Sequence, residues 1–255
     1  MEIIKEDDTM SKRLDGRKVD ELRPIEAKAG VIAGADGSGY FKIGNTVAYA
    51  AVYGPRELFP KFKQDTQTGI LRCNYNMMPF SGMGDRVRPG PSRRSKEISM
   101  VTTAALAPVV DLSEFKNTVV DVFIELPQTD AGSRCAGICA ASIALADAGI
   151  PMKDFVSAIA VGRVHDQIVV DLDYKEEQPG DGSESVDIPV AMIPSTKEIT
   201  LLQMDGIVSD KELFAALDKV HDACVRIKEV QQQAILDKYE QLEQEAKTFM
   251  EGGAQ

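Results

Sequence analysis

Apolar residues occur along this chain in short runs separated by turn-forming residues, and this spacing predicts a series of β-strands. Short runs rich in Val, Ile and aromatic side chains are typical of strands when Gly, Pro, Asn or Asp bound them. We expect strands at residues 31–35, 39–53, 70–78, 118–126, 158–164, 167–172, 186–193 and 198–204. Gly44 and Asn45 predict a hairpin turn inside the second of these ranges.

Other stretches carry apolar residues at helical spacing. One helix is expected to begin near Ser92, a good N-cap residue, and to bury Ile98, Val101, Ala105 and Val109. A second helix is expected over residues 135–148, where Ala, Gly, Cys, Ile and Leu predominate. Its small side chains allow close packing against neighbouring elements.

A long helix is expected at the C-terminal end of the chain. Ser209 and Glu212 have the spacing of a capping box, in which each side chain bonds the other residue's backbone N–H. Apolar positions recur after this pair and become sparse after Ile235. We therefore expect the last turns of this helix to project from the core.

Strands interspersed with helices indicate the α/β (α+β) class, with mixed β-sheets packed against helices. We divide the chain into a flexible N-terminal tail at residues 1–13, a catalytic domain at 14–235, and a projecting helix end and tail at 236–255. With 255 residues and 44% hydrophobic composition, the chain is long enough to bury a substantial core.

Composition excludes some classes of protein. No run of about 18 apolar residues occurs, so we expect no membrane partner or span. Residues 1–12 are charged and resemble no secretory signal. The cysteines lie inside predicted strands and helices without metal-ligand spacing; they are Cys73, Cys135, Cys139 and Cys224. Buried free thiols in a reducing cytoplasm are the expected interpretation.

The net charge of −11 argues at first against a nucleic-acid partner, but the charge is unevenly distributed. Residues 171–185 hold six acidic residues and one lysine, and residues 209–255 hold ten acidic and six basic residues. The rest of the chain is near neutral and contains a basic cluster at Arg86, Arg88, Arg93, Arg94 and Lys96. This local patch is compatible with binding phosphate groups at one place.

Gly132, Ser133 and Arg134 lie where a buried strand turns into a helix. Free backbone N–H groups and the helix dipole favour an anion there, a hydroxyl adds a donor, and a guanidinium adds a fixed positive charge. These residues taken alone leave two interpretations open. One is a phosphate site, and the other is an ordinary turn with Arg134 in solvent.

Several longer motifs, in order along residues 14–230, resemble the RNase PH family, and in particular the catalytic ring subunits of archaeal RNA exosomes. They are Leu14-Asp15-Gly16-Arg17-Lys18, Glu21-Leu22-Arg23-Pro24, Ala51-Val52-Tyr53-Gly54-Pro55-Arg56-Glu57, Tyr75-Asn76-Met77-Met78-Pro79-Phe80, Pro89-Gly90-Pro91-Ser92-Arg93-Arg94-Ser95, Thr129-Asp130-Ala131-Gly132-Ser133-Arg134, Ala146-Asp147-Ala148-Gly149-Ile150-Pro151 and Asp187-Ile188-Pro189-Val190-Ala191-Met192-Ile193-Pro194. The resemblance implies an RNase PH-like fold and processive 3′→5′ phosphorolysis of single-stranded RNA, with inorganic phosphate as co-substrate.

The resemblance also implies roles for basic residues. Gly132, Ser133, Arg134 and Arg94 match the family's phosphate site. Arg93 and Arg94 match arginines that hold phosphate and the RNA end, while Lys61 and Lys63 fall where the family lines an RNA channel. As residues in a polar loop, these two lysines are equally compatible with solvated side chains.

Asp187 resembles the family's catalytic carboxylate, acting as a general acid or as a ligand for Mg²⁺. A second carboxylate usually lies six residues earlier, which selects Asp181. Because the loop before Asp187 is about four residues longer than expected, Glu177 is the alternative. We expect the insertion to lie upstream of Asp181, which would then share the metal with Asp187.

Implied partners are a non-catalytic RNase PH-type subunit alternating with this chain in a heterohexameric ring, and RNA-binding cap subunits. Two other identities remain open at this stage. One is the non-catalytic ring subunit itself, which is expected to lack the carboxylate pair or the Gly132-Ser133-Arg134 turn. The other is a bacterial-type RNase PH that trims tRNA 3′ ends.

Overall fold

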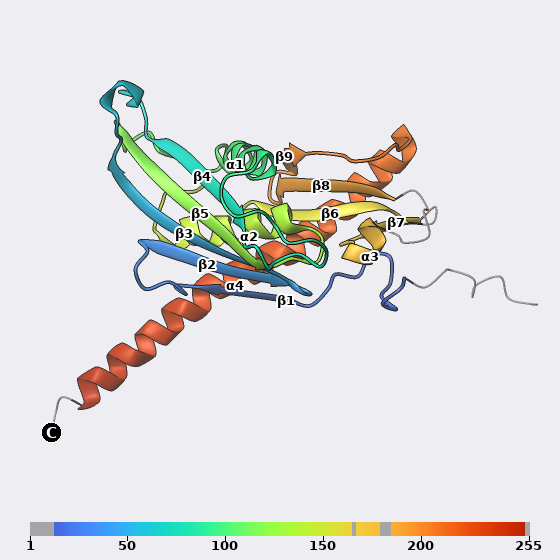
Figure 1. Ribbon diagram of the computed structural model, residues 1–255. Helices are drawn as coiled ribbons and strands as arrows, with labels where there is room; N and C mark the ends of the chain where they lie inside the picture. The colour runs from blue at the N-terminus through green and yellow to red at the C-terminus, as the bar shows by residue number, and fades with distance from the viewer. Residues whose placement is uncertain (1–12, 165–166, 179–184, 253–255) are drawn as a thin grey trace, which may run out of the picture.

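The computed structural model describes residues 13–164, 167–178 and 185–252. Two β-sheets lie on either side of a central helix, and a long helix extends beyond them (Figure 1). This arrangement confirms the predicted mixture of sheets and helices.

The first sheet has five strands in the order β1-β2-β3-β5-β4. They are β1 (Ile25–Ala29), β2 (Gly37–Ile43), β3 (Thr46–Glu57), β4 (Ile70–Met77) and β5 (Thr118–Gln128). β4 pairs with β5 in parallel, and the other neighbours are antiparallel. Because β4 and β5 are parallel, their carboxyl ends meet at the same edge of the sheet.

The second sheet has four antiparallel strands in the order β7-β6-β8-β9. They are β6 (Ser157–Val164), β7 (Gln167–Val170), β8 (Val186–Ile193) and β9 (Glu198–Leu202). β8 lies in the interior of this sheet, so its first residues are held on both sides.

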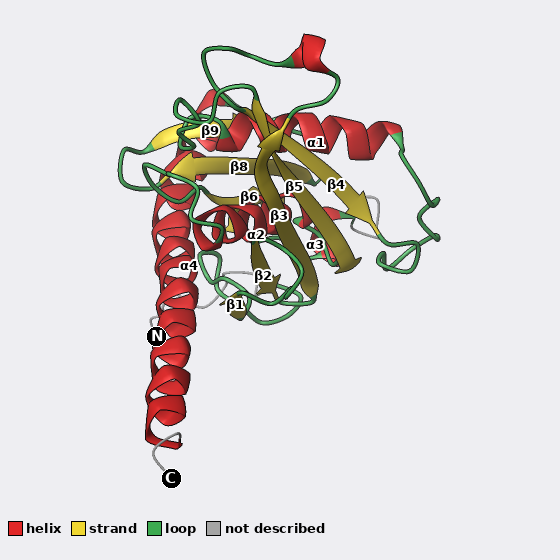
Figure 2. Cartoon of the chain, turned by 90° about the vertical axis from the view of Figure 1, so that its left-hand side faces the viewer, coloured by secondary structure: helices red, strands yellow, loops and turns green. Residues whose placement is uncertain are grey.

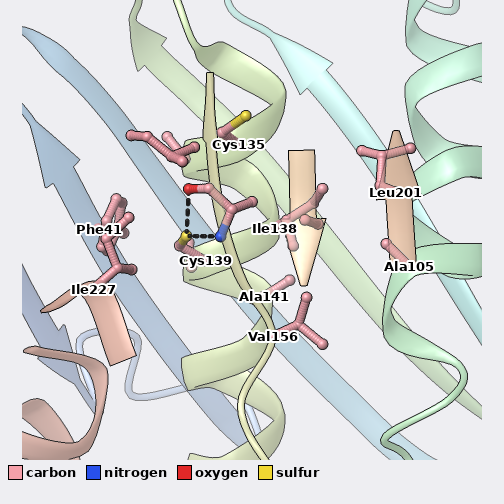
Figure 3. Packing of buried hydrophobic residues seen from close by; sticks show 14 of the residues in the cluster. Phe41, Ala105, Cys135, Ile138, Cys139, Ala141, Val156, Leu201 and Ile227 are labelled. Carbon is pink, nitrogen blue, oxygen red and sulfur yellow. Dashed lines mark hydrogen bonds between the residues drawn. The ribbon is translucent and has the colours of Figure 1, made fainter. Parts of the chain in front are cut away.

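Helix α2 (Ser133–Asp147) packs between the two sheets, contacting β2, β3 and β5 on one side and β6 and β8 on the other. Small residues on both surfaces permit a close approach. A Cβ added at Gly39 of β2 would lie 2.3 Å from the carbonyl oxygen of Ala140. Figure 3 shows Cys135, Ile138 and Cys139 of α2 in this packing, with Phe41 nearby.

The four cysteines are buried and free within the described part of the chain, as the sequence predicted. Cys139 lies against the backbone of Ala158 on β6, with Sγ 3.3 Å from its N and 3.4 Å from its O (Figure 3). Burial raises the pKa of the Cys139 thiol to about 12. These thiols are therefore protonated packing residues.

Helix α1 (Arg93–Leu106) covers β4, and the short helix α3 (Tyr174–Glu177) follows β7. Ser92 caps α1 as predicted, because its side chain accepts from the backbone N–H of Ser95. A 3₁₀ turn, η1 (Lys61–Lys63), lies beyond the end of β3.

One predicted strand was wrong. Residues 31–35 form turns and irregular structure, while the strand is β1, at Ile25–Ala29. β1 alternates apolar residues with the charged residues Glu26 and Lys28, and among the described strands it pairs only with β2, at the sheet edge. A half-exposed edge strand needs little apolar sequence, so a stronger apolar run nearby was misleading.

Helix α4 (Asp210–Gly252) begins at the predicted capping box, where Ser209 N donates to Glu212 Oε2 at 2.7 Å. It packs against β6, β7 and β1, and its last turns extend beyond both sheets (Figures 1 and 2). Among the described residues, no helix combines the length and apolar character that a membrane crossing requires.

Candidate active site

A pocket of about 320 Å³ opens where the first turns of α1 and α2 face α3 and the start of β8. Its lining includes Arg94, Ser133, Arg134, Glu177 and Asp187. Three of these residues carry positive or hydrogen-bonding groups suited to an anion, and two carry carboxylates. The fold therefore brings the predicted basic and acidic site residues together from four separate elements.

The turn before α2 is held in an unusual backbone conformation. Ala131 and Gly132 have φ angles of 57° and 61°, so two consecutive residues are left-handed. Thr46, fully buried at the start of β3, holds this turn from behind. Its hydroxyl accepts from Asp130 N at 2.9 Å and donates to the carbonyl of Ala131 at 2.7 Å. The turn is thus fixed before any ligand binds.

The first turn of α2 lines the pocket through Gly132, Ser133 and Arg134. Gly132 is the N-cap and, among the described residues, no side chain caps this end of the helix. The free backbone N–H groups of a helix's first turn, together with the positive end of the helix dipole, bind anions such as phosphate. The structure therefore favours the anion-site interpretation of this turn over an ordinary turn.

Side chains extend this anion site. Arg134 is held by a hydrogen bond from its Nη1 to Gln203 Oε1, and Gln203 Nε2 in turn donates to Glu97 at 3.0 Å. Arg94 reaches the pocket from the first turn of α1. The sequence alone did not indicate Gln203, because it follows β9 and carries no motif.

Tyr75 of β4 is a further lining residue that the site prediction missed. Its hydroxyl is buried next to Ser133, and burial raises its pKa to about 12. The phenol therefore stays protonated and can donate a hydrogen bond. It was singled out only as part of a family motif, because a tyrosine within an apolar strand usually packs in the core.

Asp187 and Glu177 form the acidic side of the pocket. Asp187 is the second residue of β8, and its backbone pairs with that of Asp205 through N–O distances of 3.0 and 2.8 Å. Glu177 is the last residue of α3. Burial, followed by the negative charge of Glu177, raises the pKa of Asp187 to about 7. Burial also raises the pKa of Glu177, whereas Arg94 and Arg134 act in the opposite direction.

Two carboxylates with raised pKa values favour the binding of a proton or a cation between them. Magnesium is usually held in proteins by one or two carboxylates together with substrate phosphates, so Glu177 and Asp187 fit such an ion. Within the described residues, no cluster of three or more metal-ligating side chains occurs. A metal here would depend on the substrate for part of its coordination.

Other predicted site residues lie elsewhere. Arg93 is exposed at the start of α1 and is not among the residues that line the described pocket. Lys61 and Lys63 lie in η1, at the tip beyond β3 and far from α3 (Figure 1). Lys61 contacts Glu57 at 3.8 Å. Asp181 falls outside the described residues, so its role stays a prediction.

An RNase PH-like fold with a helix-capped anion site and a facing carboxylate pair defines the class of protein. The model of the 3′ exoribonuclease family matches in its two parts, domain 1 over residues 21–151 and domain 2 over residues 154–223. The chain belongs to this family, which confirms the resemblance seen in the sequence motifs.

Relatives and solved structures agree with this assignment. "Exosome complex component Rrp41" of Nitrosopumilus maritimus is 48% identical over 91% of this chain and 93% of that protein. Its namesake in Thermococcus kodakarensis is 48% identical over 93% of this chain and 94% of that protein. Rice Rrp46 superposes with a TM-score of 0.75 at 24% identity, covering 86% of this chain and 98% of that one. An Archaeoglobus fulgidus exosome chain, from a structure with RNA bound to the active site, superposes with a TM-score of 0.72 at 24% identity. The match covers 86% of this chain and 92% of that one.

Proposed function

We propose that this chain is the catalytic, Rrp41-type subunit of an archaeal exosome, degrading RNA by 3′→5′ phosphorolysis. The observation that carries the proposal is the shared pocket, in which the anion-binding turn of α2 faces Asp187 and Glu177. Both features that a non-catalytic ring subunit is expected to lack are present. The similarity to Rrp41 proteins favours the exosome over a bacterial-type RNase PH.

Phosphorolysis brings an anionic phosphate against an anionic phosphodiester, so charge repulsion is the main barrier to reaction. In the proposed reaction, a phosphate oxygen forms a bond to the phosphorus of the last phosphodiester, and the bond to the preceding 3′-oxygen breaks. The products are a nucleoside 5′-diphosphate and an RNA shorter by one nucleotide. Arg94, Arg134 and the α2 N–H groups would neutralise the charge of the reacting phosphates.

The departing 3′-oxygen requires a proton or a cation. Asp187 has a pKa of about 7, so a substantial fraction carries a proton near neutral pH and can act as general acid. Magnesium, if bound by Asp187 and Glu177, would supply positive charge to the phosphate oxygens. Glu177 raises the pKa of Asp187 and so helps Asp187 keep its proton.

We also propose the chain's partners. The named relatives are exosome components, and the Archaeoglobus structure holds RNA at its active site. By analogy, this chain would bind single-stranded RNA and other exosome subunits. A cytoplasmic heterohexameric ring with a non-catalytic RNase PH-type subunit, completed by RNA-binding cap subunits, is the assembly we propose. Arg93, Lys61 and Lys63 would contact the RNA backbone in a salt-sensitive manner.

The nucleotide product tests the proposed function. When a 3′-labelled RNA is incubated with the assembled enzyme, we expect nucleoside diphosphates, and only when inorganic phosphate is present. The reason is that the phosphate bound at Gly132, Ser133 and Arg134 is itself the nucleophile. Chromatography of the released nucleotides with and without phosphate distinguishes the outcomes. Release of nucleoside monophosphates in phosphate-free buffer indicates hydrolysis and contradicts the proposal.

Substitution of the pocket arginines should weaken binding of phosphate. Arg134→Ala or Arg94→Ala is expected to raise the KM for phosphate roughly 10- to 150-fold, because hydrogen bonds to charged groups contribute about 1.5–3 kcal/mol. Arg93→Ala is the matched control, since it removes the neighbouring exposed arginine. It should weaken RNA binding and leave the phosphate KM near the wild-type value. Equal phosphate KM values in all three variants would show that Arg94 and Arg134 do not bind phosphate.

A further inference from the structure

The N-terminal segment from Arg13 to Pro24 has no part in the mechanism above, although it contains two of the family motifs. The structure places Arg13 in the interior, with 3% of its side chain exposed, although the sequence assigned it to a flexible tail. Arg23 is also buried, at 7%. Two buried arginines next to an active-site pocket call for a physical explanation, because burial of an unpaired charge is strongly unfavourable.

Arg13 pairs with Glu176, the residue immediately before Glu177. Its Nε lies 2.8 Å from Glu176 Oε1, and its Nη2 lies 2.6 Å from Oε2. The same guanidinium donates to the carbonyls of Val170 at 2.8 Å and Asp171 at 2.7 Å. Arg13 thus joins the end of β7 to α3.

Arg23 makes a second connection. It forms a two-point ion pair with Asp171, with Nε and Nη2 at 2.9 and 2.7 Å from the carboxylate oxygens. Its Nη1 lies 2.5 Å from the carbonyl of Asp130, in the turn that leads to Gly132. Asp130 in turn accepts from the backbone N–H of Tyr174, the first residue of α3, at 3.1 Å. The carboxylate side and the anion side of the pocket are therefore linked.

Helix α3 depends on these contacts because it is only four residues long. A single helical turn is unstable by itself, since it fixes several residues for one hydrogen bond. Its capping box uses Asp173 and Glu176: Glu176 N donates to Asp173 Oδ1 at 2.9 Å, and Glu176 Oε2 accepts from Asp173 N at 3.1 Å. The same carboxylate that caps α3 is thus the one that Arg13 holds.

From this geometry we propose that Arg13 is a positioning residue, which acts through Glu176 to hold α3 so that Glu177 faces Asp187 across the pocket. Arg13 and Glu176 lie on the buried side of α3, and the next residue, Glu177, lines the pocket. The expected effect of Arg13 on turnover rests on the proposed function. The claim that Arg13 holds α3 rests only on the contacts described above.

Arg13→Ala should lower kcat about 10²-fold, because small displacements of a catalytic group are enough to produce such losses. The KM for phosphate and the affinity for RNA should stay within about twofold of wild type, since the anion site is intact. Glu176→Gln, which keeps the size of the side chain, should change kcat in the same direction. It serves as the second variant if Arg13→Ala does not fold.

Lys238→Ala is the matched control. Lys238 pairs with Asp147, whose side chain is 3% exposed, at the end of α2 opposite the pocket. This variant likewise removes a cation that is paired with a buried carboxylate. In Arg13→Ala, Glu176 would keep only the longer ion pair with Arg17 Nη2, at 3.8 Å. Lys238→Ala should lower the melting temperature while kcat stays near wild type. If Lys238→Ala and Arg13→Ala lose kcat equally, or if Arg13→Ala raises KM and leaves kcat unchanged, the positioning role is wrong.

Hydrogen exchange separates this inference from the proposed function. In the full-length chain, the amides of Glu176, Glu177 and Gln178 are hydrogen-bonded within α3. Arg13→Ala should increase their exchange at least tenfold, while exchange in the first turn of α2 and in the Lys238→Ala control stays unchanged. An enzyme that releases no nucleoside diphosphate would refute the proposed function, and the exchange result would still decide whether Arg13 holds α3. Unchanged exchange in α3 overturns the inference.

Discussion

Asp187→Asn is expected to lower the turnover number by about 10²–10⁴-fold, the usual effect of removing a general acid, and to leave RNA binding intact. Asparagine has the size of aspartate but carries no transferable proton. The arginines and the α2 N–H groups, which would bind the substrates, lie elsewhere in the pocket. Single-turnover rates with saturating phosphate, together with the Kd for RNA, measure the two effects. A collapse of RNA affinity in Asp187→Asn would show that this carboxylate binds substrate.

The pH dependence of kcat is a second test of Asp187 as the general acid. Burial and the neighbouring Glu177 raise the pKa of Asp187 to about 7, so the protonated form predominates below that pH. If this form is the general acid, wild-type kcat should fall as the pH rises through about 7. This fall in kcat with rising pH should be absent from the residual activity of Asp187→Asn. A wild-type profile flat from pH 6 to 8 would contradict general-acid catalysis.

Protein stability separates loss of chemistry from loss of folding in this variant. The pKa of Asp187 is higher in the folded than in the unfolded chain, so folding is favoured while the carboxyl is protonated. That contribution is lost as the pH rises through about 7. Asp187→Asn, which cannot ionise, should therefore unfold at a higher temperature than wild type at pH 8. The difference should shrink toward pH 5.

Glu177→Gln is expected to have the next largest effect, a loss of turnover of about 10²-fold with phosphate KM unchanged. Without the charge of Glu177, the pKa of Asp187 falls, because that charge is the main cause after burial. The decline of kcat with pH should therefore move to lower pH in this variant. The measurement is the kcat profile at saturating phosphate.

Asp181→Asn is the matched comparison for Glu177→Gln. The sequence favoured Asp181, by counting back six residues from Asp187, and kept Glu177 as the alternative. Glu177 lines the pocket in the structure, whereas Asp181 lies outside the described residues, so the choice between them stays a prediction. We expect Asp181→Asn to retain nearly full activity. The reverse order of effects, with Asp181→Asn inactive and Glu177→Gln active, would show that Asp181 is the second catalytic carboxylate.

Much of this protein is determined locally by its sequence. The caps at Ser92 and Ser209 were predictable because a helix start depends on a few consecutive residues. The turn at residues 130–134 was predictable for the same reason, since one short segment supplies the backbone N–H groups and a guanidinium. Family membership followed from motifs that are contiguous in the chain. The edge strand β1 was missed because its alternation of small and charged residues is a weak signal.

Only the tertiary structure decided which distant residues meet. Arg13 pairs with Glu176 across 163 positions, and Gln203 holds Arg134 across 69. Glu177 reaches the same pocket as Asp187 because α3 is held both by Arg13, through Glu176, and by the contacts of Tyr174 and Arg23 with Asp130. Periodicity specifies which face of an element is buried, but not which element covers it. Glu177 enters the pocket through packing of this kind, so counting along the loop could not identify it as a lining residue.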